Sequence, residues 1–185
     1  AAGAVDHDSI VRQAEQLFGH LPASARRPRD GARWQGAETR RVKKLEQAHF
    51  ALAFEGPGYM APDFYAAQIW TSALGGGMSS RLFQKIREER GLCYSIFAQA
   101  GAYDDTGMIT IYAGTSEEEV AQLENLTIDE LKRATEDMTD AEVARARAQM
   151  KAGVLMGLEG AAGQADWLGR SMLSHGRVIP AAEMI

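Results

Sequence analysis

The spacing of apolar residues divides the chain into helices and strands. Residues 6–21 carry apolar side chains at helical spacing, and Asp8 or Ser9 is placed to cap that helix. Apolar residues occupy alternate positions up to Phe54, which predicts a strand over 42–54. Helical spacing returns from about residue 62 to residue 74. The chain therefore starts with a helix, a strand and a second helix.

A glycine turn, a capped helix and a hairpin are predicted next. The serines after the glycines can cap a helix from residue 81 to about residue 90, and Gly91 is placed as its C-terminal cap. Segments 92–102 and 107–115 have strand character, and the polar residues between them signal a turn. These two segments are predicted to form an antiparallel hairpin.

Two capping boxes mark the starts of the remaining helices. Ser116 with Glu119 is predicted to open one helix, and Thr139 with Glu142 to open another. The helical pattern continues over 140–176, where two glycines near residue 160 can divide it. A strand, helices, a hairpin and further helices predict an α+β fold, with a mainly antiparallel sheet and helices packed on one face.

The composition also suggests how the chain is organised into domains. Residues 22–40 are rich in proline, glycine and charge, which is typical of a linker. We therefore expect residues 1–21 to be the remnant of a preceding N-terminal domain. Residues 41–185 are expected to form a C-terminal domain that is truncated at its end. The sequence is accordingly interpreted as a piece of a longer protein.

Charge and cysteine content narrow the function classes. A net charge of -5 disfavours nucleic acid as the main partner, because phosphate binding requires clustered lysine and arginine. The single cysteine, Cys93, excludes an intrachain disulfide and lies in an apolar pattern typical of a small buried residue. No apolar run approaches the roughly 18 residues of a membrane span, and no signal peptide is visible, so a cytoplasmic setting is expected.

The residues alone point to no catalytic motif. The four histidines are far apart in sequence, and none belongs to an H-E-x-x-H or H-x-x-E-H pattern that would bind zinc. His49, on a predicted strand, is interpreted as a hydrogen-bonded structural residue. By spacing alone, Arg87 is a solvated helix residue and Tyr94 a half-buried strand residue.

A longer motif changes this interpretation. The segment LGGGMSSRLFQKIREERGLCYSI, which starts at Leu74, strongly resembles the insulinase/mitochondrial processing peptidase family of zinc metallopeptidases, and above all its bacterial processing-peptidase-like members. Shorter pieces along nearly the whole chain also look like family positions; they include Gln47-Ala48-His49-Phe50, Asp105-Thr106-Gly107 and His175-Gly176-Arg177. The resemblance therefore covers most of the sequence in order.

The resemblance implies a fold, a site and a set of partners. Family members look like two homologous halves that close on a chamber, with the zinc ligands in the N-terminal half. The C-terminal half supplies an arginine and a tyrosine, seven residues apart, that contact substrate. Arg87 and Tyr94 match that pair in spacing and context. The implied partners are a peptide or unfolded polypeptide substrate, the N-terminal half of the same protein, and a second subunit in a homo- or heterodimer.

We accordingly expect the C-terminal, substrate-binding half of a zinc metalloendopeptidase. Zinc is expected in the intact enzyme, with its ligands outside this chain, and the chain by itself is expected to be inactive. The main alternative is a non-catalytic partner subunit of a heteromeric peptidase, which carries the arginine and tyrosine but no zinc motif. A structural role in a respiratory complex is a third possibility, which the presence of Arg87 and Tyr94 makes less attractive.

Overall fold

The computed structural model describes residues 1–22 and 30–184. The chain forms two compact units, one made of Gly31–Ala148 and the other of Ala1–Asp30 with Gln149–Ile185. Among the described residues, no helix has the length and apolar character needed to cross a lipid bilayer.

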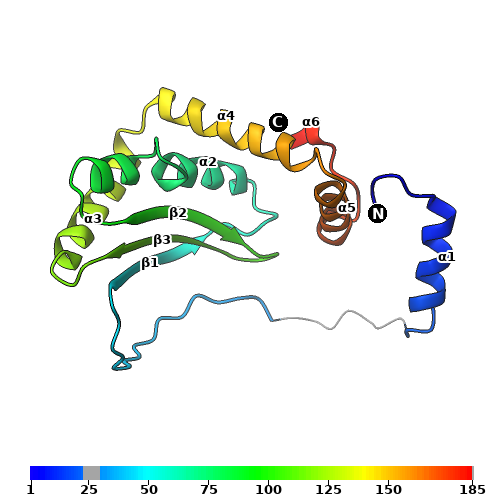
Figure 1. Cartoon of the computed structure of the whole chain (residues 1–185), viewed down its shortest axis with the longest axis horizontal. Coiled ribbons are helices and arrows are strands. Elements are labelled where there is room, and N and C mark those ends of the chain that lie inside the picture. Colours follow the sequence, from blue (N-terminus) through cyan, green and yellow to red (C-terminus); the bar gives the residue numbers. More distant parts are fainter. Residues whose placement is uncertain (23–29, 185) are drawn as a thin grey trace. The chain divides into compact units, whose positions relative to one another are not determined.

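The larger unit is built on a three-stranded antiparallel sheet (Figure 1). Its strands are β1 (Ala48–Gly56), β2 (Ser95–Ala102) and β3 (Gly107–Thr115), in the spatial order β1-β3-β2. The predicted hairpin is confirmed, because β2 and β3 pair directly across a short turn. The predicted strand over 42–54 is wrong at its start. It begins at Ala48, which pairs with Thr115, the last residue of β3, so residues before Ala48 have no strand to pair with.

Helices pack on one face of this sheet. They are α2 (Phe64–Gly75), the π-helix η1 (Phe83–Glu88) and α3 (Val120–Glu136). The buried core contains side chains from each of them and from the inward positions of the strands; its fully buried members include Leu74, Leu82, Ile86, Ile111 and Leu123. The α+β prediction, with helices on one face of an antiparallel sheet, is confirmed.

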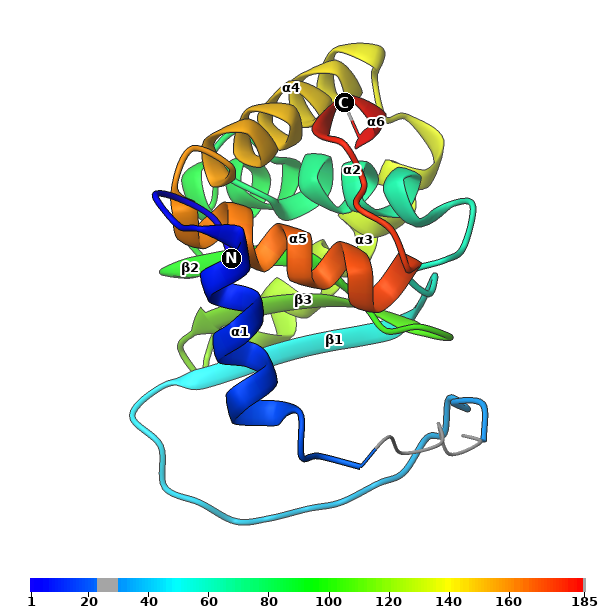
Figure 2. The same ribbon diagram turned by 90° about the vertical axis from the view of Figure 1, so that its right-hand side faces the viewer.

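The contact between α2 and β2 is unusually close, and both elements lie side by side in Figures 1 and 2. A Cβ atom added to Gly75 would lie only 2.4 Å from the backbone nitrogen of Ala98. Only glycine permits this approach, because any side chain would force the helix away from the strand. The first glycine of the turn is thus required by the close packing of α2 on β2.

The helix α4 (Asp140–Gly157) starts with the predicted capping box. The Glu142 carboxylate accepts hydrogen bonds from the backbone nitrogen of Thr139 at 2.9 Å and from its hydroxyl at 2.7 Å. The Glu142 nitrogen donates back to the Thr139 hydroxyl oxygen at 3.3 Å. At α3 the predicted box is wrong, because Glu119 makes no capping hydrogen bond and Glu118 interacts with the Ser116 hydroxyl instead.

The smaller unit contains α1 (His7–Phe18), α5 (Ala161–His175) and the short α6 (Ala181–Met184); Figure 2 shows the turn that leads from α5 to α6. The cap of α1 is Asp6, whose carboxylate accepts from the Ser9 nitrogen at 2.7 Å, and not Asp8 or Ser9 as predicted. Trp167 of α5 donates its indole N–H to the carbonyl of Ile179 at 2.9 Å, which holds the turn against the helix.

The predicted linker, 22–40, is only partly described. Residues 23–29 lie outside the described residues, and residues 30–40 contain neither helix nor strand. The backbone nitrogen of Ala32 donates to the Asp105 carboxylate at 2.7 Å, at the turn of the β2–β3 hairpin. This contact ties the segment to the larger unit.

Candidate functional site

The site is formed where η1 ends and β2 begins. Gly91 adopts a φ of +66°, a left-handed conformation that glycine reaches without steric cost. The Gly91 nitrogen donates to the carbonyl of Arg87 at 3.0 Å, and the Leu92 nitrogen donates to that of Ile86 at 3.2 Å. The helix therefore ends sharply at Gly91, and the chain turns back to enter the sheet after Tyr94. This turn brings Arg87 close to Tyr94.

The helix before this turn has a π geometry, although the sequence predicted an ordinary helix from residue 81. The Glu89 nitrogen donates to the carbonyl of Gln84, five residues earlier, at 2.9 Å. The π-helix spans Phe83–Glu88 and so includes Arg87. Short π segments are rare and are found frequently at functional sites.

Arg87 and Tyr94 form a loose pair. The guanidinium carbon of Arg87 lies 4.5 Å from the centroid of the Phe83 ring and 6.0 Å from that of Tyr94. Such positions are favourable, because the face of an aromatic ring attracts a cation. The guanidinium also forms an ion pair with Glu88 at 3.3 Å, and the Tyr94 side chain is 86% exposed. The phenol is therefore open to a ligand, beside an arginine that Phe83 holds in place.

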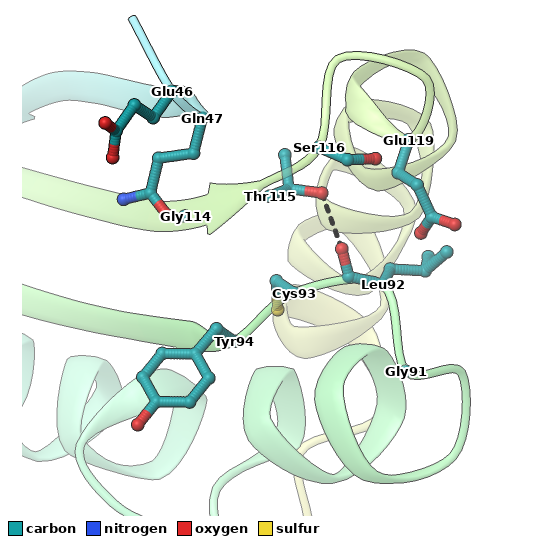
Figure 3. Close-up of a pocket in the computed structure, with 10 residues that line it drawn as sticks. All are labelled: Glu46, Gln47, Gly91, Leu92, Cys93, Tyr94, Gly114, Thr115, Ser116 and Glu119. Atoms are coloured by element: carbon teal, nitrogen blue, oxygen red, sulfur yellow. Dashed lines mark hydrogen bonds between the residues drawn. The ribbon is translucent and has the colours of Figure 1, made fainter.

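A pocket of about 430 Å³ opens beside Tyr94 (Figure 3). It lies at the end of the sheet where β1 and β2 start and β3 ends. Arg87 does not line this pocket. The lining comes from three segments: Glu46 and Gln47; Gly91, Leu92, Cys93 and Tyr94; and Gly114, Thr115, Ser116 and Glu119.

Two hydrogen bonds join residues that line this pocket. The Thr115 hydroxyl donates to the carbonyl of Leu92 at 2.6 Å, and both groups are drawn in Figure 3. The Tyr94 nitrogen donates to the carbonyl of Gly114 at 3.1 Å. Two hydrogen bonds thus join the segment that carries Tyr94 to the end of β3. The position of Tyr94 therefore depends on the pairing of β2 with β3.

Cys93 belongs to the core and not to the chemistry of the pocket. It is 8% exposed and packs in the hydrophobic cluster. Burial raises the pKa of its thiol, the Arg87 guanidinium lowers that pKa in part, and the Glu119 carboxylate raises it further. The thiol therefore stays protonated near neutral pH, where a nucleophile would need to be a thiolate. This agrees with the interpretation of Cys93 as a small buried residue.

The described residues offer no metal site. Within 1–22 and 30–184, no group of three histidine, cysteine, aspartate or glutamate side chains could hold an ion. His49 is hydrogen-bonded, as interpreted from the sequence, because its Nδ1 lies 2.7 Å from the Tyr112 hydroxyl.

A family model, described as the peptidase M16 inactive domain, matches residues 1–150. The chain belongs to the peptidase M16 inactive-domain family. The resemblance seen in the sequence is thereby confirmed, and the chain is a C-terminal domain of the kind found in zinc-protease-like proteins.

Relatives of known sequence agree with this family. An uncharacterized zinc protease of Rickettsia felis is 36% identical over 185 residues, which is 100% of this chain and 45% of that protein. An uncharacterized zinc protease of Bacillus subtilis, YmxG, is 33% identical over 174 residues, which is 92% of this chain and 42% of that protein. The chain thus spans less than half the length of these relatives.

Solved structures share the fold. A protease from Helicobacter pylori superposes with a TM-score of 0.75 at 19% identity, over 94% of this chain and 44% of that one. A chain of Complex III2 from Candida albicans superposes with a TM-score of 0.80 at 24% identity, over 97% of this chain and 45% of that one. At such low identity these matches show the fold of the family and nothing of its chemistry.

Sequence reasoning missed most of the pocket. It identified Tyr94 through the motif, but nothing in the sequence marks Gln47, Gly114 or Glu119 individually as a residue of a binding site. They meet Tyr94 because β1 and β3 pair in one register, with His49 opposite Gly114. The available signal was indirect, since Gln47 opens one of the shorter pieces that resemble the family and Gly114 lies in another, Ile111-Tyr112-Ala113-Gly114-Thr115.

Proposed function

We propose that this chain is the C-terminal, substrate-binding half of a zinc-dependent metalloendopeptidase that degrades or processes peptides in a closed chamber. In this proposal residues 1–21 belong to the preceding catalytic domain, residues 22–40 are a linker, and residues 41–185 form most of the substrate-binding domain. The relatives named zinc proteases, each about twice as long as this chain, support the proposal.

The observation that carries the proposal is the placement of Arg87 and Tyr94. Both residues flank the turn at Gly91, 6.0 Å apart from guanidinium carbon to ring centroid, with the phenol exposed beside the pocket. A guanidinium has five N–H donors and a phenol has one, and peptide carbonyls are the acceptors that such donors bind. The pair would hold an extended substrate, and would bind the oxygen on which charge develops more strongly than a neutral carbonyl.

The described residues do not fit a zinc site, so zinc in the intact enzyme would be bound by ligands from the N-terminal half. We propose that half as the main partner, with a homo- or heterodimer as the assembly and the cytoplasm as the compartment. The substrate would be a peptide or an unfolded polypeptide, because a folded protein could not lie extended against the pocket. By itself the chain would not hydrolyse peptides.

Substitution in the full-length parent protein tests the roles of the pair. We expect Arg87→Ala and Tyr94→Phe each to lower kcat/KM for a peptide by roughly 100- to 1,000-fold, the usual effect of removing one donor to a developing oxyanion. Zinc content, measured by elemental mass spectrometry, should stay at the wild-type value, because neither residue is proposed as a ligand. Unaltered kinetics in both variants would reject the assigned roles.

The alternative is a non-catalytic partner subunit of a heteromeric peptidase. It agrees with the match to a family described as an inactive domain. The zinc content of the parent protein separates the two proposals. About one zinc per subunit supports the peptidase, and a protein without zinc supports the partner subunit.

A further inference from the structure

Two stripes of side chains run along η1 and the turn before it, and one of them faces the core. Leu82 and Ile86 are four residues apart, and both are fully buried. Phe83 and Arg87, each one residue later, form the neighbouring stripe. The Phe83 side chain is partly buried against the core, and 33% of the Arg87 side chain is exposed. The ring of Phe83 is therefore restrained by packing, whereas the long Arg87 side chain reaches the surface.

The contacts of the Arg87 guanidinium are unequal in strength. Its carbon lies 4.5 Å from the centroid of the Phe83 ring, well inside the roughly 6 Å over which an aromatic face attracts a cation. The Tyr94 centroid lies at that limit, 6.0 Å away. Among the described residues, its one hydrogen-bonding partner is the Glu88 carboxylate at 3.3 Å, on a side chain that is 52% exposed. An exposed ion pair contributes little, so the Phe83 ring is the stronger restraint.

The π turn sets the direction in which Arg87 leaves the helix. The Glu89 nitrogen donates to the carbonyl of Gln84, and the Gln84 side chain donates to the carbonyl of Met78 at 2.7 Å. A π turn holds one residue more than an α-helical turn, so Arg87 projects at a different angle from that of an ordinary helix. Phe83 is the first residue of this π-helix, and Arg87 is its fifth. Both partners of the ring contact therefore belong to one local geometry.

A ring contact suits an arginine that has to bind a substrate. Arginine loses much rotamer freedom when it is held in one position, and a packed ring imposes that loss before the substrate arrives. Contact through the face of the guanidinium also leaves the N–H donors in its plane free for a carbonyl. The ion pair with Glu88 uses one of those donors instead. The ring contact thus prepares the donors, and the ion pair competes for them.

We infer that Phe83 is a positioning residue, which holds the Arg87 guanidinium near Tyr94 with its donors free for the substrate. Phe83 acts through Arg87 and does not itself touch the substrate in this inference. Without the ring, the guanidinium would turn towards Glu88 and solvent. The inference rests on the proposed peptidase function.

The test is a double-mutant cycle in the full-length parent protein with its zinc. The substrate is a fluorogenic peptide built on the fastest wild-type cleavage site in reduced, carboxymethylated α-lactalbumin. Phe83→Leu keeps an aliphatic side chain against the core and removes the ring. We expect it to lower kcat about tenfold and to change KM by less than about twofold, because the donors that bind developing charge are misplaced. In the Arg87→Ala background, Phe83→Leu should lower kcat no further, because no guanidinium is left to position.

Further variants separate positioning from packing. Phe83→Tyr restores a ring at the same place, so kcat should stay within about twofold of wild type. Phe54→Leu is the matched control, because Phe54 is also partly buried against the core but pairs with Ile109 near the β2–β3 turn; it should leave kcat unaltered. Phe83→Met fills the space without a ring and should lower kcat as Phe83→Leu does. It decides the question if Phe83→Leu fails to fold.

The outcomes separate this inference from the function on which it rests. A parent protein that cleaves no peptide overturns the proposed function and the positioning role with it. Turnover that falls in Arg87→Ala but stays at the wild-type value in Phe83→Leu overturns the positioning role alone. A loss from Phe83→Leu that adds in full to the loss from Arg87→Ala also overturns it, because Phe83 would then act without Arg87.

Discussion

The ion pair between Arg81 and Glu142 should stabilise the larger unit in a pH-dependent way. Arg81 lies just before η1, and its guanidinium donates to both oxygens of the Glu142 carboxylate, at 2.8 Å to one of them. It also donates to the side chain and to the backbone carbonyl of Asp137. The two paired side chains are mostly buried, with 13% of Arg81 and 16% of Glu142 exposed. One guanidinium thus joins the start of the η1 segment to the start of α4.

The magnitude follows from the pKa of Glu142. The hydrogen bond from Arg81 is the largest cause that lowers this pKa, from 4.5 to about 2, and the capping contacts with Thr139 add to it. A drop of about 2.5 pKa units at 1.36 kcal/mol each corresponds to about 3 kcal/mol, which remaining solvent contact reduces to about 2 kcal/mol. Because the folded-state pKa is depressed, this stabilisation is present above pH 4.5 and is lost as the pH falls towards 2.

Glu142→Gln removes the charge and keeps an acceptor for the capping box, since glutamine serves at that position too. Urea denaturation, followed by circular dichroism, should show a free energy of unfolding about 2 kcal/mol below wild type at pH 7, and a difference that shrinks as the pH approaches 2. Glu124→Gln, at an exposed position of α3, is the matched control and should change stability by less than about 0.5 kcal/mol. Equal effects of the two substitutions at pH 7 would refute the reasoning.

Three further predictions concern the turn and its neighbours. In thermal melts, Gly91→Ala should lower the free energy of unfolding by about 1–2 kcal/mol through the positive φ alone, because nothing lies within 4 Å of the added Cβ. Gly77→Ala is the control and should be nearly neutral, because its added Cβ also lies in open space and its φ is not positive. Cys93 should react with a thiol reagent at pH 8 only after denaturation, because it is buried and its pKa is raised; rapid labelling of the native protein would contradict the burial. Arg87→Lys in the parent protein should retain more peptide turnover than Arg87→Ala but less than wild type, because an ammonium keeps the charge and loses the planar fork of donors; wild-type kinetics in Arg87→Lys would show that charge alone suffices.

Local features of the structure could be predicted from the sequence because a few neighbouring residues determine them. The Thr139–Glu142 capping box spans four residues. The left-handed conformation of Gly91 was predictable because a glycine directly after a helix commonly ends it in that conformation. The β2–β3 hairpin needs only two strand patterns and a turn between them. The predicted end of the first strand near Phe54 was close for the same reason, since Gly56-Pro57-Gly58 interrupts the alternation.

Local patterns misled at the starts of two helices. Ser116 and Glu119 have the spacing of a capping box, but Ser116 interacts with Glu118, and one carboxylate oxygen of Glu119 is buried without a hydrogen-bond partner. The π geometry of η1 also left no trace in the periodicity, because its effect is one extra residue in a turn whose apolar positions remain buried.

The order of the elements and the turn at Gly91 could be predicted from the sequence alone, and a motif made Arg87 and Tyr94 the candidate pair. The tertiary structure decided what surrounds that pair. The β1–β3 register fixes where β1 begins and sets His49 opposite Gly114, and the β2–β3 register sets Phe97 opposite Tyr112. A slip of one residue would turn the outward-facing residues into the core, and only packing of the opposite face against α2, η1 and α3 excludes that slip. The β1–β3 register pairs strands that are far apart in sequence, so the pocket exists only in the folded chain.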